Sequence, residues 1–293
     1  MELIDIGANL GHESFAADLG AVLARARAAG VVQMVVTGAS RDGSRRALEI
    51  ARAHPGFLYA TAGVHPHHAT EYTEEADAEL RALHGAAVAP GIVPPCTAVA
   101  PGIVPPATLV RPCTAEIVAV GECGLDYHRD FSPRPAQRRA FERQLQIAAD
   151  TGKPVFLHQR DAHDDLLAIL KDFDGRIGPA VVHCFTGTQA QMFECLDAGY
   201  YIGITGWLCD ERRGLHLREM VRHIPADRLL IETDAPYLLP RTVRPPPSHR
   251  RNEPMFLRHI VEELARDRGE PVELTAAAST AAARAFFRLP IPA

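Results

Sequence analysis

The chain has 293 residues, of which 47% are hydrophobic, and it carries a formal net charge of −5 together with 14 histidines. This length suits one large α/β domain, because (β/α)8 barrels typically contain about 250 residues. Proteins that coat duplex nucleic acid are usually basic, so the charge argues against tight wrapping of DNA but not against a local grip on a few phosphates.

Short apolar runs alternate with segments that have apolar residues at helical spacing. Most of the runs are continuously apolar, as expected for strands that are buried on both faces of a parallel sheet. The predicted strands cover residues 3–6, 31–36, 57–62, 117–120, 154–157, 180–182, 200–204 and 229–231. The predicted helices cover residues 15–29, 135–151, 161–173, 189–198, 214–224, 253–268 and 272–287. Eight strands that alternate with helices indicate a closed barrel or a doubly wound sheet, and the pattern alone does not choose between them.

One segment interrupts this alternation. Residues 87–97 read AVAPGIVPPCT and residues 98–108 read AVAPGIVPPAT, which is a tandem duplication with one substitution. Proline and glycine at this density exclude a helix or a central strand. We therefore predict that residues 87–113 form a loop inserted into a single barrel domain, before the fourth strand. A partner-binding proline motif is the alternative, but no PxxP pattern with flanking charge supports it.

The cellular location is predicted from three absences in the sequence. The six cysteines show no CxxC spacing, which in a chain of this length is typical of reduced thiols. The N-terminus MELIDIGANL lacks the basic and apolar regions of a signal peptide. No apolar run approaches the roughly 18 residues of a membrane span. We expect a cytoplasmic protein without a membrane segment, and a monomer, because no exposed apolar stripe stands out.

Polar side chains with ligand chemistry lie at the ends of five predicted strands. They are His65, Glu122, His158, His183 and Asp234. In a (β/α)8 barrel all strand ends of this kind lie on one rim, where catalytic residues converge. This placement favours the barrel over the doubly wound sheet.

Imidazoles and carboxylates are ligands for Zn²⁺, Mn²⁺ and Mg²⁺. A bound divalent ion can acidify a water molecule and polarise a phosphoryl oxygen. Each residue alone also has a simpler explanation, since a histidine at a strand end is more often a satisfied polar group, and a carboxylate often caps a helix or pairs with arginine. Several such residues in one register make the simpler explanation weaker for the set.

Several longer motifs are similar to those of the TatD deoxyribonuclease family. The motifs are TAGVHPH, IGECGLDYHRDFS, QRRAFERQLQIAADTGKPVFLHQRDAHDDL, HCFTGT, YIGITGWLCDERRG and LLIETDAPYLLPR followed by SHRRNEP. They run in order from about residue 3 to about residue 287, interrupted by the proline repeat. The resemblance implies a TIM-barrel metallohydrolase with 3′–5′ exonuclease activity on single-stranded DNA and on RNA. It also implies dependence on Mg²⁺ or Mn²⁺, with Zn²⁺ as a further ion in crystals, and a role in DNA repair or degradation.

The resemblance also implies roles for individual residues. Glu122, His158 and His183 match metal ligands of the family. Asp234 matches the aspartate that binds metal and handles the proton of the attacking water, and His65 matches the histidine near the scissile phosphate.

The chain departs from the broad family at the end of the first strand. The family usually has a His-x-His pair there, whereas this chain has Gly7 and Asn9. Glycine offers no ligand, and asparagine offers only a weak carbonyl oxygen. The resemblance therefore implies one well-supplied metal position, while a second position lacks its usual ligands.

Basic residues on the same rim are candidates for contacts with the substrate, because arginine binds phosphate through two nitrogens. The candidates are Arg160, Arg212, Arg250 and Arg251, with further basic residues at Arg213, Arg241, Arg244 and His249. The only tryptophan, Trp207, could stack on a base or pack against its loop. The alternative explanation for these segments is a solvated loop, with Asp161 and Asn252 capping helices.

Two other functions remain open from the sequence. The same metal site could activate water for attack on a carbonyl, as in other amidohydrolase-type enzymes, but those often carry a carboxylated lysine where this chain has Glu122. A barrel that has lost catalysis and acts as a binding protein is the second alternative. Gly7 and Asn9 support it, and the intact set of ligands speaks against it.

Overall fold

The computed structural model describes residues 1–85 and 116–291, so the predicted 87–113 insertion lies outside the described residues. Eight parallel strands form one sheet in the order β1 to β8, which is also their order in the chain. The strands are β1 (Leu3–Ala8), β2 (Val31–Val36), β3 (Leu58–Ala62), β4 (Ile117–Asp126), β5 (Val155–Arg160), β6 (Ala180–Val182), β7 (Tyr201–Ile204) and β8 (Leu229–Ile231). Because the strand order never reverses, the sheet is not doubly wound, and the predicted (β/α)8 barrel is confirmed.

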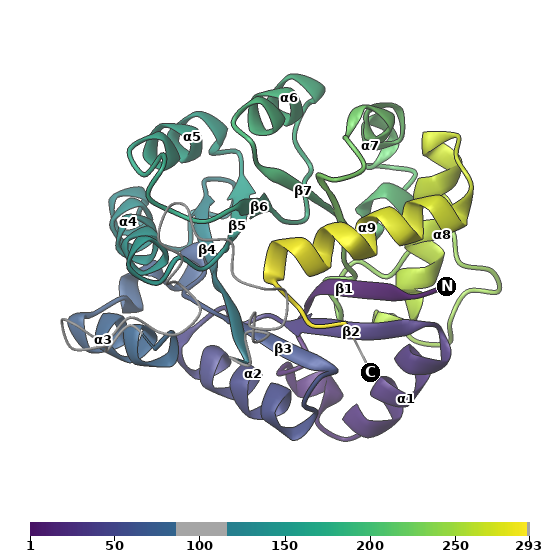
Figure 1. Cartoon of the computed structure of the whole chain (residues 1–293), viewed down its shortest axis with the longest axis horizontal. Coiled ribbons are helices and arrows are strands. Elements are labelled where there is room, and N and C mark those ends of the chain that lie inside the picture. The colour runs from purple at the N-terminus through teal and green to yellow at the C-terminus, as the bar shows by residue number, and fades with distance from the viewer. Residues whose placement is uncertain (86–115, 292–293) are drawn as a thin grey trace, which may run out of the picture.

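The helices of the described residues surround this sheet (Figure 1). The α-helices are α1 (Leu19–Ala28), α2 (Arg41–Ala53), α3 (Glu74–Leu83), α4 (Arg134–Thr151), α5 (His163–Lys171), α6 (Gln189–Asp197), α7 (Leu215–Met220), α8 (Leu257–Arg268) and α9 (Val272–Phe287). Short 3-10 helices are η1 (Glu13–Phe15), η2 (Pro66–Glu71), η3 (Gly206–Cys209), η4 (Val221–His223) and η5 (Pro254–Phe256). Within the described ranges, no helix combines the length and the apolar character needed to cross a membrane.

Strands β4 and β5 are longer than the sequence predicted. β4 and β5 extend past the apolar runs, so Glu122 and His158 lie within strands and not at their ends. The two strands continue to pair beyond these polar residues, with Gly124 opposite His158 and Asp126 opposite Arg160. The strands were predicted to end at these polar residues, but hydrogen bonds between the backbones of β4 and β5 extend both strands beyond them.

Some predicted helix starts were wrong. Helix α5 begins at His163, and its N-cap Ala162 provides no side-chain hydrogen bond, so Asp161 does not cap it. Helices α2 and α3 were not predicted, although α2 has a buried apolar face that includes Ala47, Leu48 and Ala51. Both begin with a polar cap: the side chain of Ser40 accepts a hydrogen bond from the amide of Gly43, and Thr73 acts in the same way for α3.

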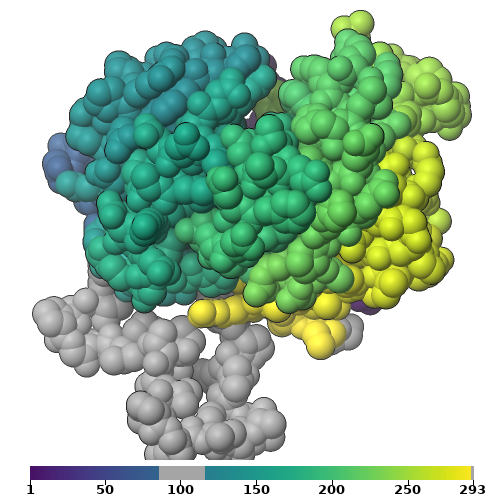
Figure 2. All heavy atoms as spheres, turned by 90° about the horizontal axis from the view of Figure 1, so that it is seen from above, coloured from purple at the N-terminus to yellow at the C-terminus, as the bar shows by residue number. Residues whose placement is uncertain are grey.

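Two groups of buried apolar side chains form the core. One lies between the outer faces of the strands and the surrounding helices. The other fills the barrel interior and includes Ile4, Phe156 and Leu230, together with Phe286 and Phe287 of α9. Helix α9 therefore closes the N-terminal end of the barrel (Figure 1). Figure 2, turned by 90°, shows α9 in yellow along one edge of the molecule and a notch in the opposite edge. The opposite face, at the carboxyl ends of the strands, is not covered by α9.

The first and last strands are joined by a buried carboxyl group. The amide of Asp234 donates to the carbonyl of Gly7 at 2.8 Å. Asp5, which is 0% exposed, accepts hydrogen bonds from the amide of Thr233 at 3.0 Å and from its hydroxyl at 2.5 Å. Burial raises the pKa of Asp5 to about 7, although these hydrogen bonds oppose the shift.

This raised pKa predicts a pH-dependent effect of Asp5→Asn. The ionised form of Asp5 is disfavoured in the fold, so its contribution to stability is present below about pH 4 and is lost as the pH rises towards 7. Between pH 4 and pH 8, the free energy of unfolding of the variant should therefore rise relative to wild type by up to about 4 kcal/mol. Urea denaturation at both pH values measures this. The exposed Asp197, changed to Asn, is the control, and a difference that does not depend on pH would contradict the assignment.

Candidate functional site

A pocket of about 690 Å³ opens at the carboxyl ends of the strands. The five side chains predicted from the strand ends all line it: His65, Glu122, His158, His183 and Asp234. They come from strands, or from segments that follow strands, on different sides of the barrel. The parallel sheet therefore brings these residues together, although they are spread over 170 positions of the sequence.

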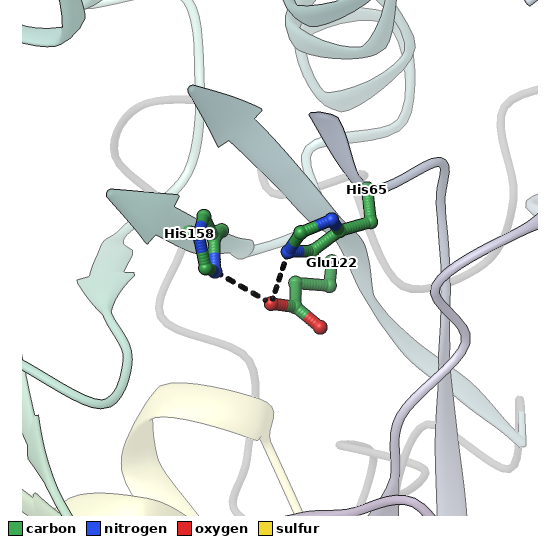
Figure 3. Close-up of side chains that lie close together, drawn as sticks. All are labelled: His65, Glu122 and His158. Carbon is green, nitrogen blue, oxygen red and sulfur yellow. Dashed lines mark hydrogen bonds and ion pairs between the residues drawn. The ribbon is translucent and has the colours of Figure 1, made fainter. Parts of the chain in front are cut away.

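Glu122 is the centre of the cluster. Its Oε1 atom lies 3.0 Å from Nδ1 of His158, 2.8 Å from Nε2 of His183 and 3.3 Å from Nε2 of His65. Figure 3 shows the rings of His65 and His158 directed at this one oxygen. Burial alone would raise the pKa of Glu122, but the charge of His183 and the hydrogen bonds from the imidazoles of His158 and His183 hold it well below its usual range. Glu122 is therefore an anion at neutral pH.

The hydrogen bonds of His65 separate it from the other two histidines. Its Nδ1 accepts a hydrogen bond from the backbone amide of His67 at 3.1 Å, so this nitrogen carries no proton. The pKa of His65 lies well below its usual value because the ring is buried beside His158, and the neutral ring must then carry its proton on Nε2. An Nε2–H group donates a hydrogen bond and offers no lone pair to a metal. His65 is thus prepared to donate to a ligand in the pocket.

His158 and His183 have the features of metal ligands. Nε2 of His158 and Nδ1 of His183 are buried and have no hydrogen-bond partner, and the same is true of Oε2 of the nearby Glu232. These two ring nitrogens are not the ones that contact Glu122: Nε2 of His158 lies 3.4 Å from Oδ2 of Asp126, and Nδ1 of His183 lies 3.4 Å from Oε2 of Glu232. Among the described residues, His65, Glu122 and His158 offer ligand atoms that lie within 4.8 Å of one another, and His183 lies outside this group. The chemistry of these donors fits a divalent cation.

Asp234 is a partly buried carboxyl group at the edge of this cluster. Burial raises its pKa to about 7, the negative charges of Glu122 and Glu232 add to the shift, and His183 opposes it. Asn9 donates from its side-chain nitrogen to Oδ1 of Asp234 at 2.9 Å. Asn9 therefore orients Asp234, whereas the sequence had suggested only a weak carbonyl ligand at this position.

The sequence analysis missed Glu232, which precedes Asp234 by two residues. Its side chain is fully buried, with Oε1 accepting from the amide of Cys184 at 2.6 Å and Oε2 lying 3.4 Å from Nδ1 of His183. A Cβ atom at Gly7 would lie 2.3 Å from Oε2 of Glu232. Glycine at the position of the family's first histidine thus makes room for this carboxylate. The two acids in LLIETDAPY were the available signal.

Asp126 and His67 form a second missed pair. Oδ2 of Asp126 lies 2.8 Å from Nε2 of His67 and 3.4 Å from Nε2 of His158. Burial would raise the pKa of Asp126, but the neighbouring imidazole of His158 and the hydrogen bonds from His67 and the amide of Arg129 bring it far below its usual value. Asp126 follows Glu122 by four residues along β4, and this even spacing was the signal that could have placed both on one face.

The candidate substrate arginines occupy three different places. Arg160 lines the catalytic pocket, and its guanidinium carbon lies 5.9 Å from the ring centre of Trp207. Arg212 and Arg250 line an adjoining groove. Arg251 lies apart from both, with ion pairs of 2.7 Å to Asp18 and to Glu253. The structure thus does not bring Arg251 to the pocket. Asn252 links the segment to β8 by donating to the carbonyls of Thr233 and Tyr237.

Known proteins resemble this chain over nearly its full length. The chain is 47% identical to a protein named "3'-5' ssDNA/RNA exonuclease TatD" from Edwardsiella piscicida, covering 98% of this chain and 100% of that protein. It is 48% identical to the protein of the same name from Erwinia billingiae, with the same coverage. Among solved structures, the TatD homologue YJJV from Escherichia coli superposes with a TM-score of 0.80 at 28% identity, over 98% of each chain.

More distant structures share the fold alone. A lactonase template engineered for organophosphate hydrolysis matches with a TM-score of 0.60 at 15% identity, covering 97% of this chain and 95% of that one. A family profile described as "TatD related DNase" matches residues 4–288. The chain therefore belongs to the TatD related DNase family, whose members are hydrolases that act on the ester bonds of DNA.

Proposed function

We propose that this protein is a metal-dependent nuclease that removes nucleotides from the 3′ end of single-stranded DNA and RNA. The curated relatives carry this activity in their names. The observation that carries the proposal is the buried anion Glu122, whose Oε1 atom is approached by three imidazoles. A carboxylate at this position of β4, where related amidohydrolases often have a carboxylated lysine, favours phosphodiester over carbonyl chemistry.

Glu122, His158 and His183 would hold one divalent ion, Mg²⁺ or Mn²⁺, with Zn²⁺ as a further ion that fits these ligands. When bound, this ion supplies positive charge that polarises a phosphoryl oxygen and lowers the pKa of a water molecule. A second ion would depend on Asp234 and on Asn9, whose nitrogen already donates to Asp234. We therefore propose one firmly bound ion and weak occupancy beside it.

The remaining steps belong to the chain's own side chains. Asp234, with a pKa of about 7, accepts the proton of the attacking water, and this match to neutral pH suits a general base. Asn9 keeps the carboxyl group in place through its hydrogen bond. His65 donates its Nε2–H to a nonbridging phosphate oxygen, as its tautomer requires. As the water oxygen bonds to phosphorus, the bonding electron pair of the scissile P–O bond passes to the leaving oxygen, which takes up a proton from solvent.

Removal of divalent ions should abolish cleavage. We expect a 5′-labelled single strand to yield a ladder that shortens from its 3′ end with Mg²⁺, no products with EDTA, and recovered cleavage when Mg²⁺ or Mn²⁺ is added back. An ester or lactone cleaved in preference to the oligonucleotide would support the carbonyl alternative. Binding of the strand without cleavage under all metal conditions would support a barrel without catalysis.

The proposal includes a monomeric, cytoplasmic enzyme that acts in DNA repair or degradation. The cysteines of the described residues are free thiols, which supports a reducing compartment. Light scattering on the purified protein tests the monomer. Sensitivity of a deletion strain to DNA damage, with rescue by wild type and not by Glu122→Gln, tests the cellular role.

A further inference from the structure

A second groove, of about 760 Å³, adjoins the catalytic pocket. The two share Trp207, Arg213 and Leu238 as lining residues, so the groove continues the pocket past the indole ring. Its walls come from η3 and from the long segment between β8 and η5. By contrast, the groove between η2 and α4 shares no lining residue with the catalytic pocket.

Positive charge gathers along this adjoining groove. Its lining includes the arginines Arg212, Arg213, Arg241, Arg244 and Arg250. Asp210 pairs with Arg212 and Arg213 at 2.9 and 3.0 Å, and Glu211 pairs with Arg241 at 2.9 Å. Two carboxylates therefore face five guanidinium groups, although the whole chain has a net charge of −5. A concave surface with one sign of charge concentrates ligands of the opposite sign.

Two of these arginines are free to bind anions. Among the described residues, the guanidinium of Arg244 donates only to the backbone carbonyls of Arg241 and Val243, and no carboxylate there pairs with its charge. Arg250 is exposed and has no ion pair within the part of the chain that the structure describes. Neither residue contributes a side chain to the core. When a polyanion binds, both side chains lose conformational entropy, and charge-assisted hydrogen bonds to its phosphates would offset this loss.

Trp207 stands at the junction between pocket and groove. It is partly exposed, and the guanidinium carbon of Arg213 lies 4.2 Å from its ring centre, with that of Arg160 at 5.9 Å. A cation held beside an aromatic face forms a platform on which an unpaired base can stack while the cation meets the neighbouring phosphate. A base inside a duplex cannot reach such a platform. This feature selects a single strand.

We propose that this groove binds the retained part of a single-stranded substrate, on the 5′ side of the scissile phosphate, with phosphates on Arg244 and Arg250 and a base on Trp207. The inference rests on the proposed function for its polarity. An enzyme that removes 3′-terminal nucleotides releases one small product and keeps the long remainder. The remainder needs a continuous track out of the pocket, and the groove past Trp207 supplies one.

Binding can be tested separately from cleavage. With EDTA present, fluorescence anisotropy of a 5′-labelled dT decamer should show a Kd about tenfold higher for the double variant R244A/R250A than for wild type. The slope of log Kd against log salt concentration should flatten by about 1.4, since each phosphate contact on a single strand contributes about 0.7. The double variant R139A/R222A is the matched control, because it removes two exposed arginines that line neither the catalytic pocket nor the groove beyond Trp207.

Trp207 is the only tryptophan of the chain, so its fluorescence reports on the groove directly. We expect an unlabelled dT decamer to quench it and a blunt hairpin of equal length to leave it unchanged. With Mg²⁺, the ratio of kcat/KM for the decamer to that for the dinucleotide should fall about tenfold in R244A/R250A and stay constant in R139A/R222A.

Equal decamer affinity in wild type and R244A/R250A, or no quenching at saturation, would overturn the groove assignment while leaving the nuclease proposal intact. If wild type cleaves neither substrate with Mg²⁺, the nuclease proposal fails. The EDTA binding data would then still decide whether the groove holds a single strand.

Discussion

Replacement of Glu122 with glutamine is expected to lower kcat/KM for a single-stranded oligonucleotide about a thousandfold. Charge stabilisation by a bound ion contributes several kcal/mol to the transition state, and about 4 kcal/mol corresponds to three powers of ten. The glutamine side chain has the same shape, and its oxygen can still accept from the imidazoles of His158 and His183. The variant loses the negative charge, which a divalent ion requires, and keeps the packing of β4.

The measurement pairs single-turnover cleavage with calorimetric titration of Mn²⁺ into the protein. We expect Mn²⁺ affinity and activity to fall together while the thermal transition of the metal-free protein changes little. Glu219→Gln is the matched control, because Glu219 is exposed and lies outside the pocket. Wild-type Mn²⁺ affinity in Glu122→Gln would show that this residue does not hold the ion, and unchanged cleavage would remove it from the mechanism.

The sequence predicted the barrel well because each strand is buried on both sides. The run at residues 180–182 is apolar without interruption and the run at residues 31–36 has one polar residue, Gln33, and the structure places strands at these same residues. The ring of site residues was also predictable, since parallel strands bring their carboxyl ends together. His65 and Asp234, far apart in the chain, line one pocket for this reason.

Other features depend on contacts that no local pattern encodes. The length of β4 is set by its pairing with β5, so the apolar run ended six residues before the strand does at Asp126. Glu232 was overlooked because a charged residue after a strand usually faces solvent, whereas here two glycines on other strands make space for it. The arginines looked alike in sequence, and only their partners distinguish Arg251, tied to Asp18, from the unpaired Arg250.

Gly7→Ala is expected to destabilise the protein by about 1–3 kcal/mol, because the new methyl group has no space. The Cβ atom would lie 2.3 Å from Oε2 of Glu232 and 3.1 Å from the ring of Phe156. Glu232 would have to move, and with it the acceptor of the Cys184 amide and the neighbour of His183. Nuclease activity should therefore fall as well, by about 10- to 100-fold, as it does when a group that orients a metal ligand is disturbed.

A double-mutant cycle separates this explanation from a general cost of alanine at Gly7. Urea denaturation should show that Gly7→Ala costs at least about 1 kcal/mol less in a Glu232→Ala background, because the clashing carboxylate is gone. Gly20→Ala in α1 is the control: no atom lies within 4 Å of its added Cβ, so it should stabilise by about 0.5–1 kcal/mol. If Gly7→Ala lowers the free energy of unfolding equally in both backgrounds, a clash with the Glu232 carboxylate is not the cause. The expected coupling would explain the missing histidine physically, since a large side chain at position 7 and a buried carboxylate at position 232 exclude each other.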